Sequence, residues 1–261
     1  MDESELVLLT LLDYSKAFDM ANHRLIIAKL KYFGFNDDAL AWITSYLSNR
    51  AQKVRTDTDS PWESIQNGVP QGSILGPLLF TVLVSDISDH IQIGSYHTYA
   101  DDVQWYFKFK HTEAVNAFET ANLVMKNIVE FSQNNFLKLN TEKTKYIIIG
   151  SQQNLKKLAE NQLPPLIVNG DIIERKKEVK NLGVIFDENM SWSNHVNNSV
   201  SKAYGRLKQA YKFRNFLSIE SRFKIIETYV LSLFNYGDVL YLNMSGRLKF
   251  MYAVCSWSSE I

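Results

Sequence analysis

Apolar and polar positions follow each other in blocks along the chain, and the blocks predict an α+β protein. Residues 6–12 are apolar apart from Thr10 and do not alternate, which is typical of a strand buried on both faces. Residues 22–33 carry apolar side chains at helical spacing and stop at Gly34, so they predict a helix. A second helix is expected to begin at Asn36, because Asn caps helices well and two aspartates follow it.

Further along, strand patterns continue to alternate with helical ones. The sequence predicts short strands within 53–67, a backbone-exposing loop at 68–73, an apolar helix over 75–87, a hairpin over 95–107 and a long helix over 112–135. It then predicts strands at 138–140 and 146–150, a hairpin turn at Asn169-Gly170, one strand over 179–186, and helices over 193–216 and 219–234. Residues 151–165 are the least patterned and are the expected domain boundary.

The composition is that of an ordinary globular protein. The 261 residues suffice for one large domain or two small ones, and 46% are hydrophobic and 21% charged. No apolar run has the length of a membrane span, and no signal peptide is recognisable. The single cysteine, Cys255, excludes an internal disulfide and a cysteine-based zinc cluster. We therefore expect an intracellular protein.

The net charge of zero conceals two halves of opposite sign. Residues 1–137 hold 10 Lys and Arg against 17 Asp and Glu, whereas residues 138–261 hold 18 against 11. An acidic half joined to a basic half suits a cation site beside a surface that binds a polyanion. Solvated faces that have drifted in charge are the alternative explanation.

Two adjacent carboxylates stand where the hairpin over 95–107 should reverse, in Tyr99-Ala100-Asp101-Asp102. Like charges at contact distance repel unless a cation neutralises them, and a hard cation such as Mg²⁺ prefers carboxylate oxygens. A solvated acidic turn is the alternative. Asp13 ends the first buried strand, at the rim of the sheet. If the hairpin packs antiparallel beside that strand, the carboxylates converge and could hold two Mg²⁺ ions for phosphoryl transfer.

Three motifs, in this order, resemble the palm motifs of reverse transcriptases, especially those of non-LTR (LINE-type) retrotransposons. They are Leu12-Asp13-Tyr14-Ser15-Lys16-Ala17-Phe18-Asp19, Asn67-Gly68-Val69-Pro70-Gln71-Gly72-Ser73-Ile74-Leu75-Gly76-Pro77 and Tyr99-Ala100-Asp101-Asp102. Residues 137–144 and 179–184 resemble the two motifs that follow in this family, and the resemblance covers about residues 6–243.

The resemblance implies a polymerase palm, which is a ferredoxin-like antiparallel sheet with packed helices, followed by a helical thumb. The expected domains are a palm over 1–150, a β-hairpin connection over 151–190, a thumb over 191–245 and a divergent tail over 246–261. The implied activity is that of an RNA-directed DNA polymerase. Such an enzyme extends the 3′-OH of a DNA primer on an RNA template with dNTPs.

The resemblance also assigns catalytic roles to individual residues. Asp13, Asp101 and Asp102 would hold two Mg²⁺ ions, with Mn²⁺ as an alternative ion. Lys143 would donate a proton to the departing pyrophosphate. Lys145 lies close enough in sequence to take that role instead, and an ordinary solvated lysine is the alternative for either residue.

Four residues are implied to contact the incoming nucleotide. Tyr14 stands where an aliphatic residue is usual in the family, and this is a mild change because the position would contribute mainly its backbone. Phe18 would be the steric gate against a ribose 2′-OH, although an aromatic at this spacing also suits the core. Gln71 would contact the nucleotide or its template base, and Gly72 would let the backbone approach closely, with simple turn chemistry as the alternative for the glycine.

The basic half of the chain fits a thumb that binds nucleic acid. Lys202 and Arg206 are four residues apart, as are Lys208 and Lys212, so each pair shares one face of the predicted helix over 193–216. Such a face could follow phosphates without reading sequence. An amphipathic helix with an ordinary solvated side is the alternative.

The sequence also departs from the family, because the first motif begins close to Met1 and the basic fingers region expected before it is missing. This departure favours a second hypothesis, a catalytically inactive retrotransposon remnant that only binds nucleic acid. A third is an unrelated two-metal phosphoryl-transfer enzyme on a similar palm.

Overall fold

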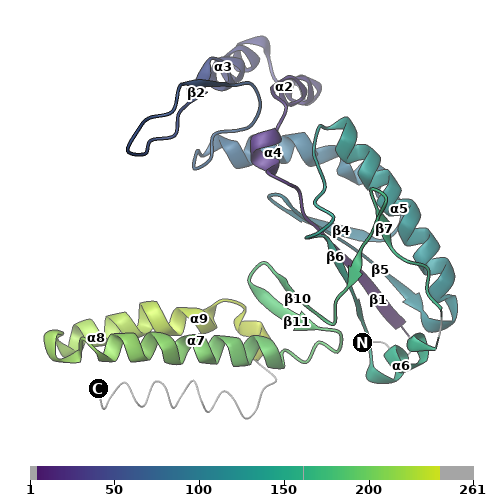
Figure 1. The fold of residues 1–261 in the computed structure, drawn as a ribbon, viewed down its shortest axis with the longest axis vertical. Coiled ribbons are helices and arrows are strands. Elements are labelled where there is room, and N and C mark those ends of the chain that lie inside the picture. The colour runs from purple at the N-terminus through teal and green to yellow at the C-terminus, as the bar shows by residue number, and fades with distance from the viewer. Residues whose placement is uncertain (1–4, 161, 242–261) are drawn as a thin grey trace. The chain divides into compact units, whose positions relative to one another are not determined.

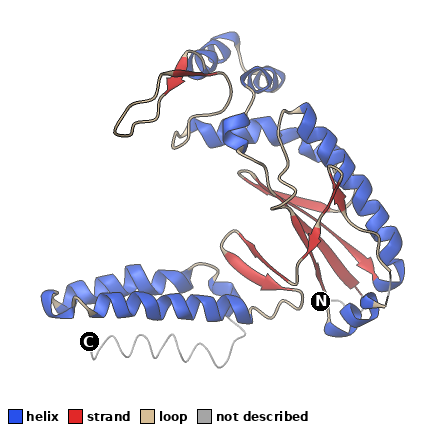
Figure 2. Ribbon diagram, viewed as in Figure 1, coloured by secondary structure: helices blue, strands red, loops and turns tan. Residues whose placement is uncertain are grey.

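The computed structural model describes residues 5–160 and 162–241, which fall into two compact units (Figures 1 and 2). The first unit is Met1–Lys177 and the second is Glu178–Ile261. The connection predicted over 151–190 therefore lies across the division. The tail predicted over 246–261, with Cys255, lies outside the described residues. In the part of the chain that is described, no helix is both long and apolar enough to cross a membrane.

The first unit is built on a five-stranded sheet. The strands of the whole unit are β1 (Glu5–Leu12), β2 (Arg50–Gln52), β3 (Glu63–Ile65), β4 (Ser95–Tyr99), β5 (Asp102–Lys110), β6 (Lys145–Ile149), β7 (Ile167–Val168), β8 (Asp171–Ile172) and β9 (Glu174–Arg175). The order in the main sheet is β4-β5-β1-β6-β9, and the pairs β2-β3 and β7-β8 are separate hairpins. The predicted α+β class is confirmed. The sheet is mixed rather than wholly antiparallel, because β9 runs parallel to β6.

Helices pack around this sheet to form one core. They are α1 (Ala17–Met20), α2 (His23–Tyr32), α3 (Asp37–Leu47), α4 (Leu75–Val84), α5 (Ala114–Asn134) and α6 (Gln152–Ala159), with short 3₁₀ turns η1 (Ser85–His90) and η2 (His111–Glu113). The largest fully buried side chains include Trp105 of β5, Phe80 of α4, and Phe118 and Phe131 of α5. Burial of each such aromatic removes 150–250 Å² from water, so these elements stabilise the sheet.

Local sequence signals placed several of these elements correctly. Asn36 caps α3 as predicted, and Asn22, which was expected to be the first residue of its helix, caps α2; each accepts a hydrogen bond from the backbone N–H three residues on. Asn169 and Gly170 have φ angles of 53° and 89°, the two left-handed residues of the predicted hairpin turn between β7 and β8. The strand predicted at 138–140 was wrong, because that stretch forms only one isolated bridge, between Leu139 and Tyr14.

The second unit combines a hairpin with a helical pair. Its elements are β10 (Glu178–Asn181), β11 (Val184–Asp187), α7 (Ser193–Tyr211), η3 (Arg214–Phe216), α8 (Ile219–Ile225), the π-helical segment η4 (Ile226–Leu231), α9 (Ser232–Asn235) and η5 (Asp238–Tyr241). The single strand predicted over 179–186 was wrong. Leu182 and Gly183 turn the chain with φ angles of 45° and 84°, so the stretch folds back on itself. Val196, Ala203, Val230 and Phe234 form the separate core of this unit.

Candidate active site

The pairing of β1 with β5 places the predicted catalytic aspartates next to each other. The two strands run antiparallel, and the last pair in register is Leu12 with Val103. Extending this register by one residue sets Asp13 opposite Asp102 at the rim of the sheet. β1 holds its register firmly because it is the central strand and most of its residues are buried. The predicted antiparallel packing of the hairpin beside the first strand is therefore confirmed.

Asp101 lies in the tight turn of this hairpin. Tyr99 of β4 pairs with Asp102 of β5, which leaves only Ala100 and Asp101 to reverse the chain. Ala100 has a φ angle of 54°, a left-handed conformation that is unfavourable for a residue with a Cβ atom. A strained residue beside two carboxylates is typical of functional sites.

The charges of the site interact. Burial, followed by the charges of Asp101 and then Asp13, raises the pKa of Asp102 above its ordinary value. Asp13 Oδ1 is buried and accepts no hydrogen bond. The ammonium of Lys143 lies beside it, with Nζ 3.6 Å from this oxygen. The three aspartates thus lie within electrostatic range of one another, with one cation beside them.

The loop that carries Lys143 is fastened to the end of β1. The backbone N–H of Asn140 donates to the Asp13 carbonyl at 2.8 Å, and the Asp13 N–H donates to Thr144 Oγ1 at 3.4 Å. The Asn140 side chain in turn accepts from the Lys143 N–H at 3.2 Å. Of the two lysines left open by the sequence, the structure brings Lys143 to Asp13 and makes Lys145 the first residue of β6.

The chemistry of these side chains suits a hard divalent cation. Carboxylate oxygens are the ligands that Mg²⁺ prefers, and Asp13 Oδ1 is a buried acceptor without a hydrogen bond. Among residues 5–160 and 162–241, however, no three His, Cys, Asp or Glu side chains are gathered tightly enough to form a metal site. The site therefore supplies suitable ligands in a loose arrangement.

The loop at residues 68–73 is docked on the segment that follows Asp13. Gly68 N–H donates to the Ala21 carbonyl at 2.7 Å, and Val69 N–H donates to the Phe18 carbonyl at 2.8 Å. His23 Nε2 lies 2.7 Å from the Gly68 carbonyl oxygen, and since that oxygen only accepts, this ring nitrogen carries the proton. The second motif is thereby held against α1 and the start of α2.

The four residues expected to contact a nucleotide differ in exposure. The Tyr14 side chain is buried, and its hydroxyl lies 3.0 Å from Ser132 Oγ, so only its backbone can face a ligand. Phe18 packs on Phe80 with ring centroids 4.7 Å apart, so its ring contacts the core, and its role as a gate stays a prediction. Gln71 is exposed, and Gly72, with φ 77°, has nothing within 4 Å of a Cβ position.

A family model extends over most of this site and its scaffold. The model described as "Reverse transcriptase (RNA-dependent DNA polymerase)" matches residues 2–186, which include all three aspartates, Lys143 and the loop at 68–73. This chain belongs to the reverse transcriptase family. The family resemblance seen in the motifs is thereby confirmed over the first unit and the hairpin β10-β11.

Known relatives agree with this assignment. The chain is 26% identical over 253 residues to the RNA-directed DNA polymerase from mobile element jockey of Drosophila melanogaster, covering 92% of this chain and 26% of the relative. It is 27% identical over 220 residues to the probable RNA-directed DNA polymerase from transposon BS of the same species, covering 80% and 23%. This reverse transcriptase chain thus spans about a quarter of the length of these relatives.

Solved structures give a more distant likeness. The chain is similar to a structure of apo telomerase from Candida tropicalis truncated from its C-terminal domain, with 11% identity and a TM-score of 0.46. The match covers 70% of this reverse transcriptase chain and 34% of the telomerase chain.

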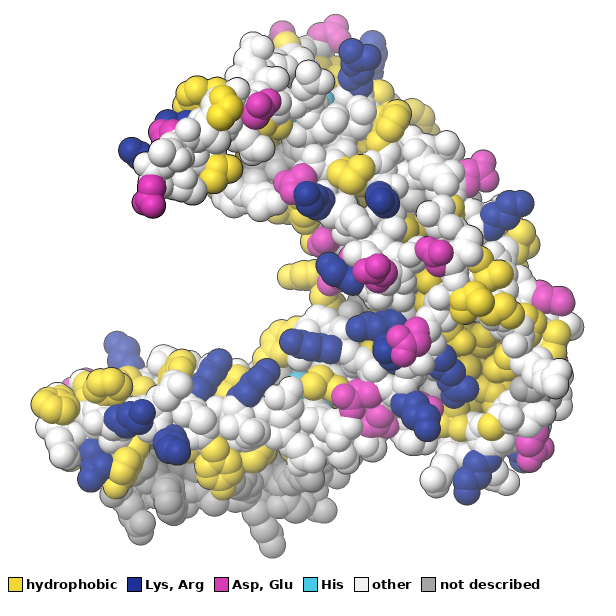
Figure 3. All heavy atoms as spheres, viewed as in Figure 1, with side chains coloured by type: hydrophobic (Ala, Val, Ile, Leu, Met, Phe, Trp, Pro, Cys, Tyr) yellow, Lys and Arg dark blue, Asp and Glu magenta, His cyan; other side chains and the backbone are white. Residues whose placement is uncertain are grey.

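Three of the basic residues predicted to bind nucleic acid, Lys202, Arg206 and Lys208, lie on α7 of the second unit, and Lys212 directly follows its last residue. Lys202, Lys208 and Lys212 are exposed, and Figure 3 shows Lys and Arg side chains recurring along this unit between exposed hydrophobic ones. Arg206 is engaged within the unit, where its guanidinium lies 4.7 Å from the Tyr229 ring centroid and donates to the Tyr229 carbonyl at 2.5 Å. The three lysines are therefore better placed than Arg206 to meet phosphates.

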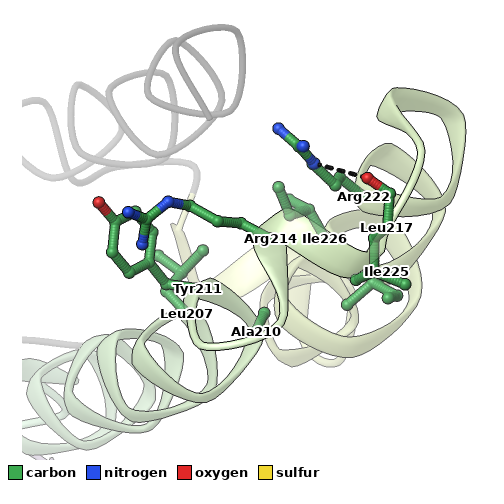
Figure 4. A pocket seen from close by; sticks show the side chains of 8 residues that line it. All are labelled: Leu207, Ala210, Tyr211, Arg214, Leu217, Arg222, Ile225 and Ile226. Carbon is green, nitrogen blue, oxygen red and sulfur yellow. Dashed lines mark hydrogen bonds between the residues drawn. The ribbon is translucent and has the colours of Figure 1, made fainter.

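Two more arginines border a small pocket in the same unit (Figure 4). The Arg214 guanidinium stacks 3.9 Å from the Tyr211 ring centroid, and Arg222 Nε donates to the Leu217 carbonyl at 3.1 Å. These contacts fix both guanidinium groups on the protein surface.

Sequence reasoning did not single out Asp19 or His23 for the site of this reverse transcriptase. Asp19 accepts a hydrogen bond from Gln71 Nε2 at 2.9 Å, and His23 holds the Gly68 carbonyl. These partners are separated by 52 and 45 residues in the chain. Only the folded arrangement brings them together, although the place of Asp19 at the end of the first motif was a signal in the sequence.

Proposed function

We propose that this chain carries the catalytic centre of an RNA-directed DNA polymerase that extends a DNA primer 3′-OH on an RNA template with dNTPs. The observation that carries the proposal is the β1-β5 register, which sets Asp13 opposite Asp102 beside the turn that holds Asp101. Family membership supports the reaction class. The relatives are about four times longer than this chain, so their full activity cannot simply be transferred to it. The use of an RNA template and a DNA primer by this chain is therefore part of the proposal.

In this proposal Asp13, Asp101 and Asp102 are the residues that would hold two Mg²⁺ ions, or Mn²⁺. When bound, the ions supply activation of the primer hydroxyl and neutralisation of the pyrophosphate charge. Burial, followed by the charges of Asp101 and Asp13, raises the pKa of Asp102, and a bound cation would favour the ionised carboxylate against all three effects.

Lys143 is proposed as the proton donor to the departing pyrophosphate. Its ammonium lies 3.6 Å from Asp13 Oδ1, and its side chain is 67% exposed, so it can reach a ligand bound at the aspartates. Phosphoryl transfer depends mainly on positioning and charge neutralisation, and an exposed ammonium beside the aspartates can contribute to both.

Phe18, Gln71, Gly72 and the backbone of Tyr14 are proposed to line the nucleotide site. Phe18 is held from behind by Phe80, so it can present a rigid edge to the sugar. Gly72 leaves the backbone open to close approach, since no atom lies within 4 Å of its Cβ position. Lys202, Lys208 and Lys212, with Arg206 beside them, are proposed to bind the phosphates of the template–primer duplex.

Primer extension by an Asp101→Asn variant tests the proposal. We expect a loss of about a thousandfold or more in rate, because one of the charges that hold the ions is removed. Asp57→Asn is a matched control, since Asp57 is an exposed aspartate in the β2–β3 hairpin. Equal extension by Asp101→Asn and the wild type would defeat the proposal.

One observation favours a second candidate, a remnant that binds nucleic acid without polymerising. The described carboxylates do not form a compact three-ligand site. This candidate predicts a template–primer gel shift that weakens with added salt, and no dNTP incorporation by the wild type in Mg²⁺ or Mn²⁺. Incorporation by the wild type would exclude it.

A further inference from the structure

The side chain of Gln71 is held by a residue to which nothing above assigns a role. Gln71 Nε2 lies 2.9 Å from Asp19 Oδ1. Asp19 belongs to α1, the short helix that begins four residues after Asp13, and Gln71 lies in the loop of the second motif. This contact links two motifs through their side chains.

The chemistry of Asp19 decides which end of the glutamine amide faces it. An ionised carboxylate accepts hydrogen bonds and cannot donate them, so Gln71 must turn its NH₂ group toward Asp19. The amide oxygen, Oε1, then points away from Asp19. A neutral amide partner would allow both orientations, because it can donate as well as accept.

The backbone around this pair prevents the two residues from drifting apart. Gly68 and Val69 donate backbone hydrogen bonds to Ala21 and Phe18, the residues around Asp19. The Cβ position of Gly68 lies 2.7 Å from the Asp19 carbonyl oxygen, so the two backbones are in direct contact. Asp19 and Gln71 are therefore set at a fixed distance by the same docking.

We infer that Asp19 is a positioning residue that orients the Gln71 amide, so that Oε1 accepts a hydrogen bond from a donor on the incoming nucleotide. The inference rests on the proposed function, because it takes Gln71 to lie at the nucleotide site. The donor is a sugar hydroxyl or a base amine, since the triphosphate oxygens are acceptors. Asp19 itself touches no substrate.

Single-nucleotide addition kinetics test this role, because they separate the apparent Kd for the dNTP from the maximal rate. We expect Asp19→Ala to raise the apparent Kd about five- to tenfold, the worth of one oriented hydrogen bond, with the maximal rate within about twofold. An equal effect with all four dNTPs assigns the donor to the sugar, and unequal effects assign it to the bases. Asp57→Asn is the control and should match the wild type.

A reversal of the hydrogen bond distinguishes positioning from a structural role. Gln71→Glu places two carboxylates together and should weaken nucleotide binding. The double variant Asp19→Asn/Gln71→Glu lets the new amide donate to the new carboxylate, which keeps an acceptor oxygen toward the nucleotide. We expect its apparent Kd to return to within about threefold of the wild type. An unchanged Kd in Asp19→Ala, or a double variant no better than Gln71→Glu, would overturn the inference.

Nucleotide binding without chemistry separates this inference from the proposed function. On a primer that ends in a dideoxynucleotide, the dNTP can stabilise the complex in a gel shift but cannot be incorporated. If the wild type binds dNTP there and fails to extend a normal primer, the proposed function fails while the variants still report on Asp19. If the wild type neither binds dNTP nor extends a primer, the proposed function and the inference about Asp19 are both overturned.

Discussion

Gly68 and Gly72 offer a direct test of how the second motif is docked. Both are left-handed glycines of the same loop, with φ angles of 90° and 77°. A methyl group at Gly68 would lie 2.7, 2.9 and 3.0 Å from three backbone atoms of Asp19, whereas one at Gly72 would meet nothing within 4 Å. Alanine at each position therefore separates the cost of backbone conformation from the cost of the close approach.

The expected difference follows from these distances. A left-handed alanine costs about 1 kcal/mol at either position. At Gly68 the contact must also open from 2.7 Å to an ordinary van der Waals distance, which strains the hydrogen bonds from Gly68 to Ala21 and from Val69 to Phe18. Each such bond contributes about 1 kcal/mol, so we expect Gly68→Ala to cost about 3 kcal/mol and Gly72→Ala about 1 kcal/mol.

Urea unfolding with hydrogen exchange measures this difference in the first unit. The amides of β1 exchange only when the core opens, so their protection reports the free energy of unfolding of this unit. Gly68→Ala should lower that protection by the larger amount. Equal losses for the two variants would refute the close packing of the loop against α1.

Two further predictions concern aspartates, one in each of the two units. Burial and the charges of Asp101 and Asp13 raise the pKa of Asp102, so its ionised form destabilises the ion-free fold as pH rises past about 4. Asp102→Asn should therefore have a higher melting temperature than the wild type at pH 7 and the same melting temperature at pH 3. A lower melting temperature of Asp102→Asn at pH 7 would contradict this. At Asp187, burial would raise the pKa, but hydrogen bonds from Ser191 and Asn189 outweigh it and lower the pKa, so the ionised carboxylate stabilises the fold until pH falls through that lowered pKa. Asp187→Asn should therefore lower the free energy of unfolding by about 1 kcal/mol at pH 7 and by progressively less toward pH 2. Urea unfolding of the second unit measures this difference.

Signals confined to a few neighbouring residues were enough for much of the fold. The Asn36 cap of α3 and the Asn169-Gly170 turn follow from side-chain chemistry that acts within three or four residues. The run before Asp13, apolar apart from Thr10, likewise predicted a strand buried on both faces, and β1 is the central strand of the sheet. These elements would form in almost any tertiary setting that buries their apolar face.

The remaining elements depend on contacts that sequence patterns do not record. Leu182 adopts a left-handed conformation that its side chain disfavours, which hid the turn between β10 and β11. α1 has only four residues, fewer than an isolated helix needs, and the docked loop supports it. The three aspartates of the candidate site could be singled out because motif order carries that information, whereas the hydrogen bond from Gln71 to Asp19 spans 52 residues. The roles of the site residues remain predictions.

The pairing of β1 with β5 has a consequence for how this chain can change over time. The alignment of Asp13 with Asp102 is fixed by the number of residues in each strand, counted from the buried pairs behind them. A substitution in either strand alters one side chain, but an inserted or deleted residue turns every later side chain to the opposite face and moves one aspartate by a full step along the strand. Drift within such a family can therefore replace many core residues, while length changes are confined to segments such as the hairpin loop between β2 and β3.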